Sequence, residues 1–263
     1  MASNKSKIIQ RYGDGTREEK RSSGSRSDYN MEYKYTKRIL DNYIKHSDAV
    51  LELGCGTGYY GVYLSDKCSN YVGIDIVPGN IEIFYKKIKD LNLHNVEAEV
   101  GDATNIELRT NNKYDVVLAL GPMYHLPPNE VQKVFEECKR LCKKDGLILV
   151  TYITKIGVYL NACLKNPREY PNTQKNNSIF KKGIDDSRDS IYWFFSPEEI
   201  EDYAKVNDLE VIDNLGVDFT FIPEYRSEMF ENAQAWEELV DFMSSSKSNT
   251  GFANHAVMIC KKT

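Results

Sequence analysis

The sequence lacks the features of several protein classes. No apolar run approaches the roughly 20 residues that cross a bilayer, and the first residues are polar where a secretory signal would be apolar. Lys and Arg (34) do not outnumber Asp and Glu (39), and the net charge is -5. Because nucleic acids and anionic membranes are bound through an excess of cations, this balance disfavours a surface that grips either one throughout. We expect a cytoplasmic protein that has no membrane partner.

Cysteine is also sparse. The six cysteines are scattered over 263 residues without a CxxC pair, so the sequence offers neither a zinc-binding spacing nor the disulfide framework of a small secreted domain. Cys138 and Cys142 lie four residues apart in a helical pattern, and we expect them to share one face of that helix as small buried side chains. No metal site is expected.

The chain does contain a regular alternation of strand and helix patterns. A helix is predicted over 31–44, and apolar runs then predict strands at 49–53, 71–76, 96–100, 114–120 and 147–153, separated by helical patterns at 81–91 and 131–142. This order predicts an α/β protein with a doubly wound, mostly parallel sheet and helices on both faces. A capping box then predicts a helix from 196 to about 209, and the remaining patterns predict strands at 210–219 and 255–262 around a helix at 234–243. The predicted sheet has seven strands, the last one antiparallel.

The domain organisation is predicted from where this alternation starts and stops. Residues 1–30 form a polar, locally basic N-terminal segment, and 31–263 are expected to form one domain. Residues 154–195 lack clear periodicity, so we interpret them as an insertion after the fifth strand that is either a lid or disordered. The aromatic residues at 192–195 either bury a strand or line an acceptor pocket together with Tyr152, Tyr159 and Tyr170.

The most informative segment is the glycine-rich turn that follows the first predicted strand, in the sequence Val-Leu-Glu-Leu-Gly-Cys-Gly-Thr-Gly-Tyr-Tyr-Gly at 50–61. Glycine permits a sharp turn and lets the backbone approach a ligand at the carboxyl end of the strand. Gly56, Gly58 and Gly61 satisfy the spacing of a dinucleotide fingerprint. The strand ends at Leu53, however, so the fingerprint should begin at Gly54, and its third position is then Tyr59.

Acidic residues at the ends of the first three strands indicate which kind of ligand the glycine turn would bind. Glu52 precedes the glycine turn, where a carboxylate suits a cationic ligand and disfavours a pyrophosphate. Asp75 closes the second strand and can accept hydrogen bonds from both hydroxyls of a ribose. Asp102 follows the third strand and can accept one from an adenine amino group.

In combination these motifs resemble those of the class I S-adenosylmethionine-dependent methyltransferases. The run Glu52–Gly58 is similar to the first motif of that family, Asp75 to its ribose-binding acid, and Gly101-Asp102-Ala103 to its adenine-side motif. The resemblance covers residues 35–155 and, more loosely, the last two strands.

The resemblance implies a Rossmann-like methyltransferase that uses S-adenosylmethionine and releases S-adenosylhomocysteine. It also implies a set of cofactor contacts: Glu52, Gly54, Cys55, Gly56, Gly58, Asp75, Ile76, Asp102, Ala103, Leu120 and Gly121. In this family the insertion after the fifth strand commonly recognises the substrate.

Three further residues are candidates for the catalytic centre. The loop 121–128 follows the fourth strand, and in it His125 can act as a general base beside Tyr124, or else cap or pack beneath the cofactor. Tyr12 lies in a segment similar to the leading part of some uncharacterised bacterial methyltransferases, which implies that it lies over the methionine end of the cofactor. Gly121 and Met123 depart from the Asp/Asn-Pro-Pro-Tyr motif of amino-group DNA methyltransferases, which disfavours that reaction.

The sequence therefore predicts an enzyme that transfers a methyl group from S-adenosylmethionine to an O or N atom of a small molecule. A protein or RNA methyltransferase is an alternative, disfavoured by the acidic balance. An NAD-dependent oxidoreductase is disfavoured by Glu52 and Tyr59, and a non-catalytic cofactor-binding module stays open. The expected partner is a small-molecule acceptor rather than nucleic acid, and the expected state is a monomer or homodimer.

Overall fold

The architecture is built around one mixed sheet. The computed structural model describes residues 4–23, 31–106, 113–186, 190–219 and 232–263. In them the strands follow the order β3-β2-β1-β4-β5-β7-β6. Their bounds are β1 Ala49–Leu53, β2 Asn70–Asp75, β3 Val96–Val100, β4 Tyr114–Ala119, β5 Cys142–Ile153, β6 Leu209–Asp218 and β7 His255–Lys262.

The first five strands are parallel, and β7 lies antiparallel between β5 and β6. The predicted fold class, with seven strands and an antiparallel last strand, is therefore confirmed. The strand order reverses between β1 and β4, which is the point where open α/β sheets bind ligands at their carboxyl edge.

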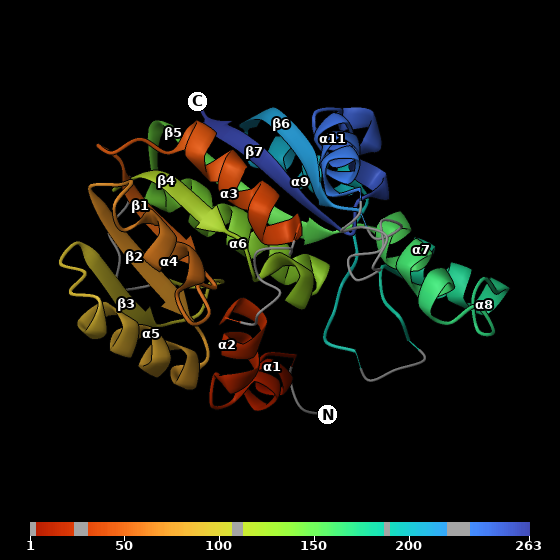
Figure 1. Ribbon diagram of the computed structural model, residues 1–263, viewed down its shortest axis with the longest axis horizontal. Helices are drawn as coiled ribbons and strands as arrows, with labels where there is room; N and C mark the ends of the chain where they lie inside the picture. Colours follow the sequence, from red (N-terminus) through yellow and green to blue (C-terminus); the bar gives the residue numbers. More distant parts are fainter. Residues whose placement is uncertain (1–3, 24–30, 107–112, 187–189, 220–231) are drawn as a thin grey trace.

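Helices cover both faces of the sheet (Figure 1). Alternate residues of each strand face opposite sides, so each face has its own core. One core packs against α3 (Met31–Tyr43), α4 (Tyr59–Leu64), α5 (Pro78–Asp90) and α11 (Ala233–Ser244). The other packs against α6 (Pro128–Leu141) and α9 (Pro197–Val206). Among the described residues, no helix has the length and apolar character to cross a membrane.

Two predictions about local structure need correction. Cys142 is extended and begins β5, so it does not share a helix face with Cys138, although both side chains are buried. The predicted capping box of Ser196 and Glu199 is present, but α9 ends at Val206. The chain reverses there because Asp208 adopts a left-handed backbone conformation, with φ 53°.

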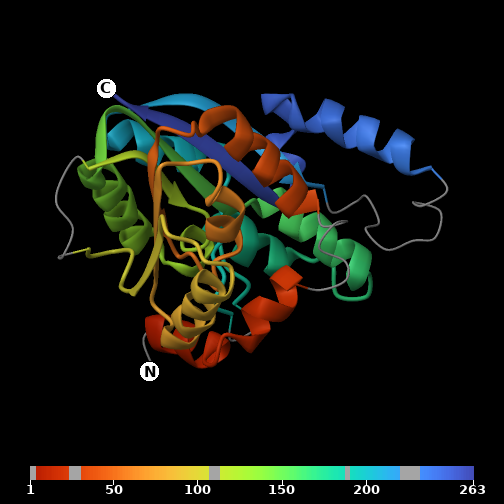
Figure 2. The same cartoon turned by 60° about the vertical axis from the view of Figure 1, so that its left-hand side comes forward.

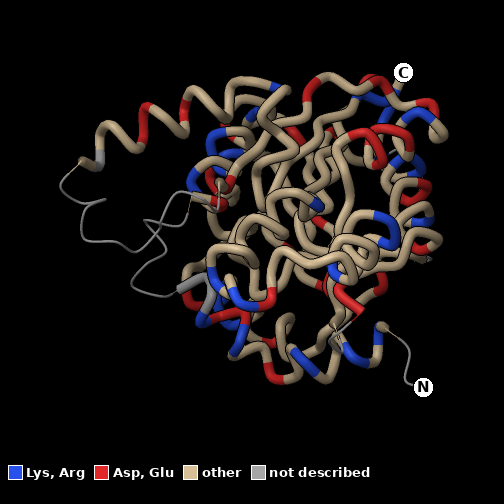
Figure 3. The backbone as a smooth tube through the Cα atoms, turned by 90° about the vertical axis from the view of Figure 1, so that its right-hand side faces the viewer, with Lys and Arg blue, Asp and Glu red and all other residues tan. Residues whose placement is uncertain are grey.

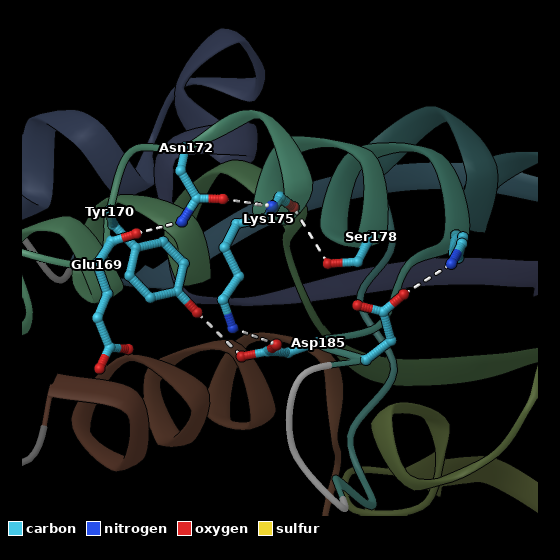
Figure 4. A network of polar contacts seen from close by, with 8 residues as sticks. Glu169, Tyr170, Asn172, Lys175, Ser178 and Asp185 are labelled. Carbon is cyan, nitrogen blue, oxygen red and sulfur yellow. Dashed lines mark hydrogen bonds and ion pairs between the residues drawn. The ribbon is translucent and has the colours of Figure 1, made fainter.

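The insertion after β5 is helical. It contains α7 (Lys155–Lys165), α8 (Thr173–Asn176) and a wide helical turn, η3 (Asn177–Lys182). Figure 4 shows what holds it together: Lys175 Nζ lies 2.7 Å from Asp185 Oδ1, and the Tyr170 hydroxyl donates to Asp185 Oδ2 at 2.9 Å. Of the two interpretations of this segment, disorder does not apply to its described residues, because Tyr170 packs with Tyr159 and Phe194 in a small core of the insertion; a role as a lid stays a prediction.

The N-terminal segment also forms helices, α1 (Asn4–Tyr12) and α2 (Thr16–Ser23). Figures 1 and 2 show them beside the start of α5, away from the face that α3 covers. Ile8 of α1 is buried against Val77 after β2 and Ile191 near the end of the insertion. The turn between the two helices packs on α5, since a Cβ placed on Gly79 would lie 2.4 Å from the Gly13 carbonyl oxygen.

We predict a large loss of stability for Gly58→Ala. Gly58 has φ 80°, and an added Cβ would lie 2.0 Å from Cδ2 of the buried Phe84. Backbone strain and overpacking should together lower the free energy of unfolding by about 3 kcal/mol or more. The measurement is urea denaturation, with Gly251→Ala as the control because its Cβ would meet no atom closer than 3.9 Å. Equal midpoints for the two variants would contradict this packing.

Candidate functional site

A cavity opens at the carboxyl edge of the parallel strands, at the reversal between β1 and β4. Its empty space is about 960 Å³, counted to where it meets solvent, which suits a small-molecule site. Helices α1, α2 and α3 contribute to its wall as well as the loops after β1 to β4. Thirteen of the predicted site residues line it: Tyr12, Glu52, Gly54, Cys55, Gly56, Asp75, Ile76, Asp102, Ala103, Leu120, Gly121, Tyr124 and His125. Gly58 does not line it and packs on Phe84 instead.

The glycine turn is fixed to the neighbouring strand by its backbone. The amides of Gly54 and Cys55 both donate to the Ile74 carbonyl oxygen, at 2.7 and 3.0 Å. Gly54 and Gly56 have φ of 76° and 54°, in the left-handed region that glycine adopts without strain. The turn therefore exposes backbone rather than side chains along the cavity floor.

Asp75 links the glycine turn to the second strand. Its Oδ2 accepts from the Gly56 amide at 2.9 Å, while Oδ1 accepts from the Val77 amide at 2.8 Å and from Asn80 Nδ2 at 3.1 Å. Burial raises the pKa of Asp75, and these hydrogen bonds oppose the increase. The carboxylate is thereby held in one orientation at the cavity wall.

Glu52 lies beside it on β1, with a fully buried side chain whose Oε2 accepts a hydrogen bond from the Tyr71 hydroxyl. Burial raises the pKa of Glu52 to about 8, against the bond from Tyr71, and the negative charges of Asp75 and Glu18 raise it further. A buried carboxyl group of this kind gains most from a cationic ligand, because a positive charge restores the stability of its ionised form.

His125, in the helical turn η2 (Met123–His125), faces the N-terminal segment. Its Nδ1 lies 3.3 Å from the Ile191 carbonyl oxygen, and its Nε2 lies 3.3 Å from the Tyr12 hydroxyl. A carbonyl oxygen only accepts, so Nδ1 carries a proton, and in the neutral ring Nε2 then presents its lone pair to the Tyr12 hydroxyl. The ring also contacts Tyr124 and Tyr192, with centroid separations of 4.7 and 5.0 Å.

The aromatic residues at 192–195 lie in different surroundings. Tyr192 lies against His125, whereas Phe195 packs into the sheet core and Phe194 into the core of the insertion. The expected burial is therefore confirmed for Phe194 and Phe195, whereas Tyr192 contacts His125 without lining the cavity, and an acceptor pocket built by this cluster stays a prediction.

Asp102 follows β3 and has a partner that the sequence did not predict. Lys5 Nζ of α1 lies 2.7 Å from Asp102 Oδ2 and 2.7 Å from Thr104 Oγ1. Burial raises the pKa of Asp102, but the hydrogen bonds from Lys5 and Thr104 outweigh it and hold the pKa below its usual value. An adenine amino group bound here would share Asp102 with Lys5.

The donor and acceptor chemistry of the cavity fits a cationic nucleoside ligand. Two lining residues have buried oxygen atoms without a partner among the described residues, Thr57 Oγ1 and Asn80 Oδ1. The amide nitrogen of the same Asn80 donates to Asp75 Oδ1, so this side chain is tied to the acid at the cavity wall. Within the same described residues, no group of three His, Cys, Asp or Glu side chains is arranged to hold a metal ion.

Comparison with known proteins agrees with this geometry. Residues 50–146, which include β1, the glycine turn, Asp75 and Asp102, match the family described as "Methyltransferase domain". Residues 50–146 thus carry a methyltransferase domain, as the resemblance to class I S-adenosylmethionine-dependent methyltransferases predicted. The predicted recognition is thus confirmed, and the family implies use of S-adenosylmethionine.

Individual members show how far the similarity extends. The phosphoethanolamine N-methyltransferase of Plasmodium falciparum is 27% identical over 118 residues, which cover 44% of this chain and 43% of that relative, less than half its length. Among solved structures, a SAM-dependent methyltransferase from Aquifex aeolicus superposes with a TM-score of 0.58 at 17% identity, covering 95% of this chain and 99% of the other. The [4+2]-cyclase SpnF has the same TM-score at 16% identity, with 87% and 80% covered. At these identities the structures show the shared fold alone.

The cavity wall also includes residues that sequence reasoning missed. They come from α1, α2 and α3 or flank the family motifs: Lys5, Ile8, Glu18, Tyr33, Tyr59, Tyr60, Val77, Asn80, Pro122 and Leu126. The sequence did contain one indication of this wall: Ile8 and Tyr12 are four residues apart, so they lie on the same face of α1. The others reach the cavity only through tertiary packing.

Proposed function

We propose that this chain transfers a methyl group from S-adenosylmethionine to an O or N atom of a small molecule. The observation that carries the proposal is that Glu52, the glycine turn and Asp75 line one cavity together with His125 and Tyr12. The acids suit the charge and hydroxyl groups of the donor, and the histidine supplies a group that can accept a proton from the acceptor.

In this proposal each predicted residue has a defined task. Glu52 binds the methionine ammonium, Asp75 the ribose hydroxyls and Asp102 the adenine side. The remaining contacts are made by Gly54, Cys55, Gly56, Ile76, Ala103, Leu120 and Gly121. The donor supplies a methyl group already activated by its sulfonium charge, so the chain has mainly to align the acceptor. His125 Nε2 accepts the proton of an acceptor that arrives protonated, and Tyr12 and Tyr124 position that ring.

The surroundings of His125 favour a small acceptor. The Tyr12 hydroxyl and the Tyr192 ring both lie against the imidazole, and Asn4 of α1 donates to the His125 carbonyl oxygen. In Figure 3 basic and acidic residues are interspersed along the described backbone, without the basic stripe that a polyanion would require. An N acceptor is in keeping with the phosphoethanolamine N-methyltransferase relative.

A nicotinamide oxidoreductase fits the cavity less well. Its fingerprint would place Gly58 beside a pyrophosphate and Gly61 in helix–strand packing, but an added Cβ on Gly58 would lie 2.0 Å from the Phe84 ring. Neither glycine lines the cavity, while Glu52 does. A pyrophosphate would therefore meet an acidic wall.

The test is a transfer assay with methyl-labelled S-adenosylmethionine and a panel of small amines and hydroxyl compounds. The proposal predicts that label moves into at least one small molecule as S-adenosylhomocysteine forms, and that Glu52→Gln strongly lowers both signals when S-adenosylmethionine is not saturating. Transfer of label only into added protein or RNA would overturn the small-molecule proposal.

A further inference from the structure

Lys5, in the first turn of α1, lies beside the acid that follows β3. Its Nζ is 2.7 Å from Asp102 Oδ2 and 2.7 Å from Thr104 Oγ1. Lys5 and Asp102 both line the cavity, although Lys5 lies far before the family motifs in the sequence. The N-terminal segment therefore places a cation directly beside the carboxylate that the proposed function assigns to adenine.

The position of Lys5 is fixed by contacts on either side of it. Asn4 donates to the His125 carbonyl oxygen, and Ile8, one turn further along α1, is buried. The ammonium also lies between two carboxylates, because Glu130 Oε1 of α6 is 3.9 Å from Lys5 Nζ. The Lys5 side chain is 27% exposed. Lys5 is therefore part of the cavity wall and not a freely moving surface side chain.

The Lys5–Asp102 pair keeps hydrogen-bonding capacity after these contacts. An ammonium has three N–H donors, and within the described residues the hydrogen bonds to Asp102 and Thr104 use two of them. Asp102 Oδ1 accepts from the Thr104 amide at 2.9 Å and from its hydroxyl at 2.8 Å. In the same described part of the chain, Oδ2 accepts from Lys5 alone and has a second lone pair. The pair thus presents an acceptor and a donor side by side.

Adenine carries the complementary groups. Its amino group donates, and a ring nitrogen on either side of that group, N7 or N1, accepts. The side-chain amides of Asn and Gln recognise adenine in DNA with the same adjacent acceptor and donor. A carboxylate and an ammonium make stronger hydrogen bonds than an amide, because both groups are charged.

We propose that Lys5 donates to the adenine ring nitrogen beside the amino group while Asp102 accepts from the amino group itself, so that the pair recognises the base of the methyl donor. This inference rests on the proposed function, because it requires S-adenosylmethionine as the ligand. It makes Lys5 a specificity-determining residue that α1 supplies, in addition to the family motifs.

The test uses S-adenosylhomocysteine and its 7-deaza and 1-deaza analogues, each of which has C–H in place of one ring nitrogen. Calorimetry gives the dissociation constants for the wild-type protein and for Lys5→Met, which keeps an apolar stem and removes the donor. In the wild type, the analogue that lacks the accepting nitrogen should bind about tenfold more weakly than S-adenosylhomocysteine, through loss of one hydrogen bond to a charged group. In Lys5→Met this difference should disappear. If neither analogue shows a loss that depends on Lys5, the inference is wrong.

Lys7→Met is the matched control, because Lys7 belongs to the same helix and does not line the cavity. This variant should keep the wild-type difference between the ligands, and its disappearance here would overturn the assignment to Lys5. Wild-type protein that binds neither S-adenosylmethionine nor S-adenosylhomocysteine would refute the proposed function itself. Binding of S-adenosylhomocysteine by the wild type, without any difference that depends on Lys5, refutes only this inference.

Discussion

Glu52→Gln is expected to weaken the binding of S-adenosylmethionine by about 100-fold, because a buried carboxylate that pairs with a cation contributes at least 2–3 kcal/mol to binding. The replacement keeps the side-chain shape and an oxygen that accepts from Tyr71, so the fold should be retained. Calorimetry with S-adenosylmethionine measures the loss. Glu97→Gln, at an exposed position of β3, is the control and should bind normally. Equal affinity of the two variants would contradict the assignment of Glu52.

The same residue predicts a pH dependence. Because burial raises the pKa of Glu52 to about 8, the ligand-free protein holds a proton on this group at neutral pH. A bound ammonium favours the ionised form, so binding releases that proton. Affinity should therefore rise with pH between 6 and about 8 and level off above it, with proton release measurable by calorimetry in buffers of different ionisation enthalpy. A wild-type affinity that does not change across this range, or a slope that persists in Glu52→Gln, would count against the model of a buried protonated carboxyl.

His125→Ala is expected to lower kcat by roughly 10²- to 10³-fold, the usual effect of removing a general base, while the Kd of S-adenosylhomocysteine stays near the wild-type value. The physical reason is the orientation of Nε2, which faces the Tyr12 hydroxyl with its lone pair while Nδ1 is held by the Ile191 carbonyl oxygen. The measurement is turnover with the acceptor that the transfer assay identifies.

Two variants complete this experiment. Tyr12→Phe removes only the hydroxyl that contacts Nε2 and should lower kcat less, by about tenfold, since the ring is still held by Ile191. His94→Ala changes an exposed histidine outside the cavity and should turn over normally. If His125→Ala kept full turnover, a role as general base would be excluded. The histidine would then have the other role predicted from the sequence, capping or packing beneath the cofactor.

The sequence predicted the sheet well because buried parallel strands are short apolar runs that differ clearly from the helices between them. The glycine turn and Asp75 were predictable for a related reason: strand ends, tight turns and their capping acids are neighbours in sequence. The final strand, His255–Lys262, was also predicted at its observed bounds, since alternating side chains mark it.

The parts that were missed depend on contacts between distant segments. Lys5 and Glu18 belong to a polar stretch that resembles a solvated tail, but the buried Ile8 and the Lys5–Asp102 and Glu19–Lys87 pairs hold it against the rest of the chain. The insertion lacks periodicity because its helices are short and its interior includes the buried Lys175–Asp185 pair, whose side chains are 10% and 13% exposed. In a sequence, lysine and aspartate usually indicate solvent exposure, but here this pair lies in the interior of the insertion.

Thermal denaturation with added ligands is the most direct test of whether the cavity between β1 and β4 binds S-adenosylmethionine. At 100 times its dissociation constant, a ligand that binds only the folded chain stabilises it by about 2.7 kcal/mol. We predict a clear rise in Tm with S-adenosylmethionine and S-adenosylhomocysteine, and none with NAD. A rise with NAD alone would contradict the account.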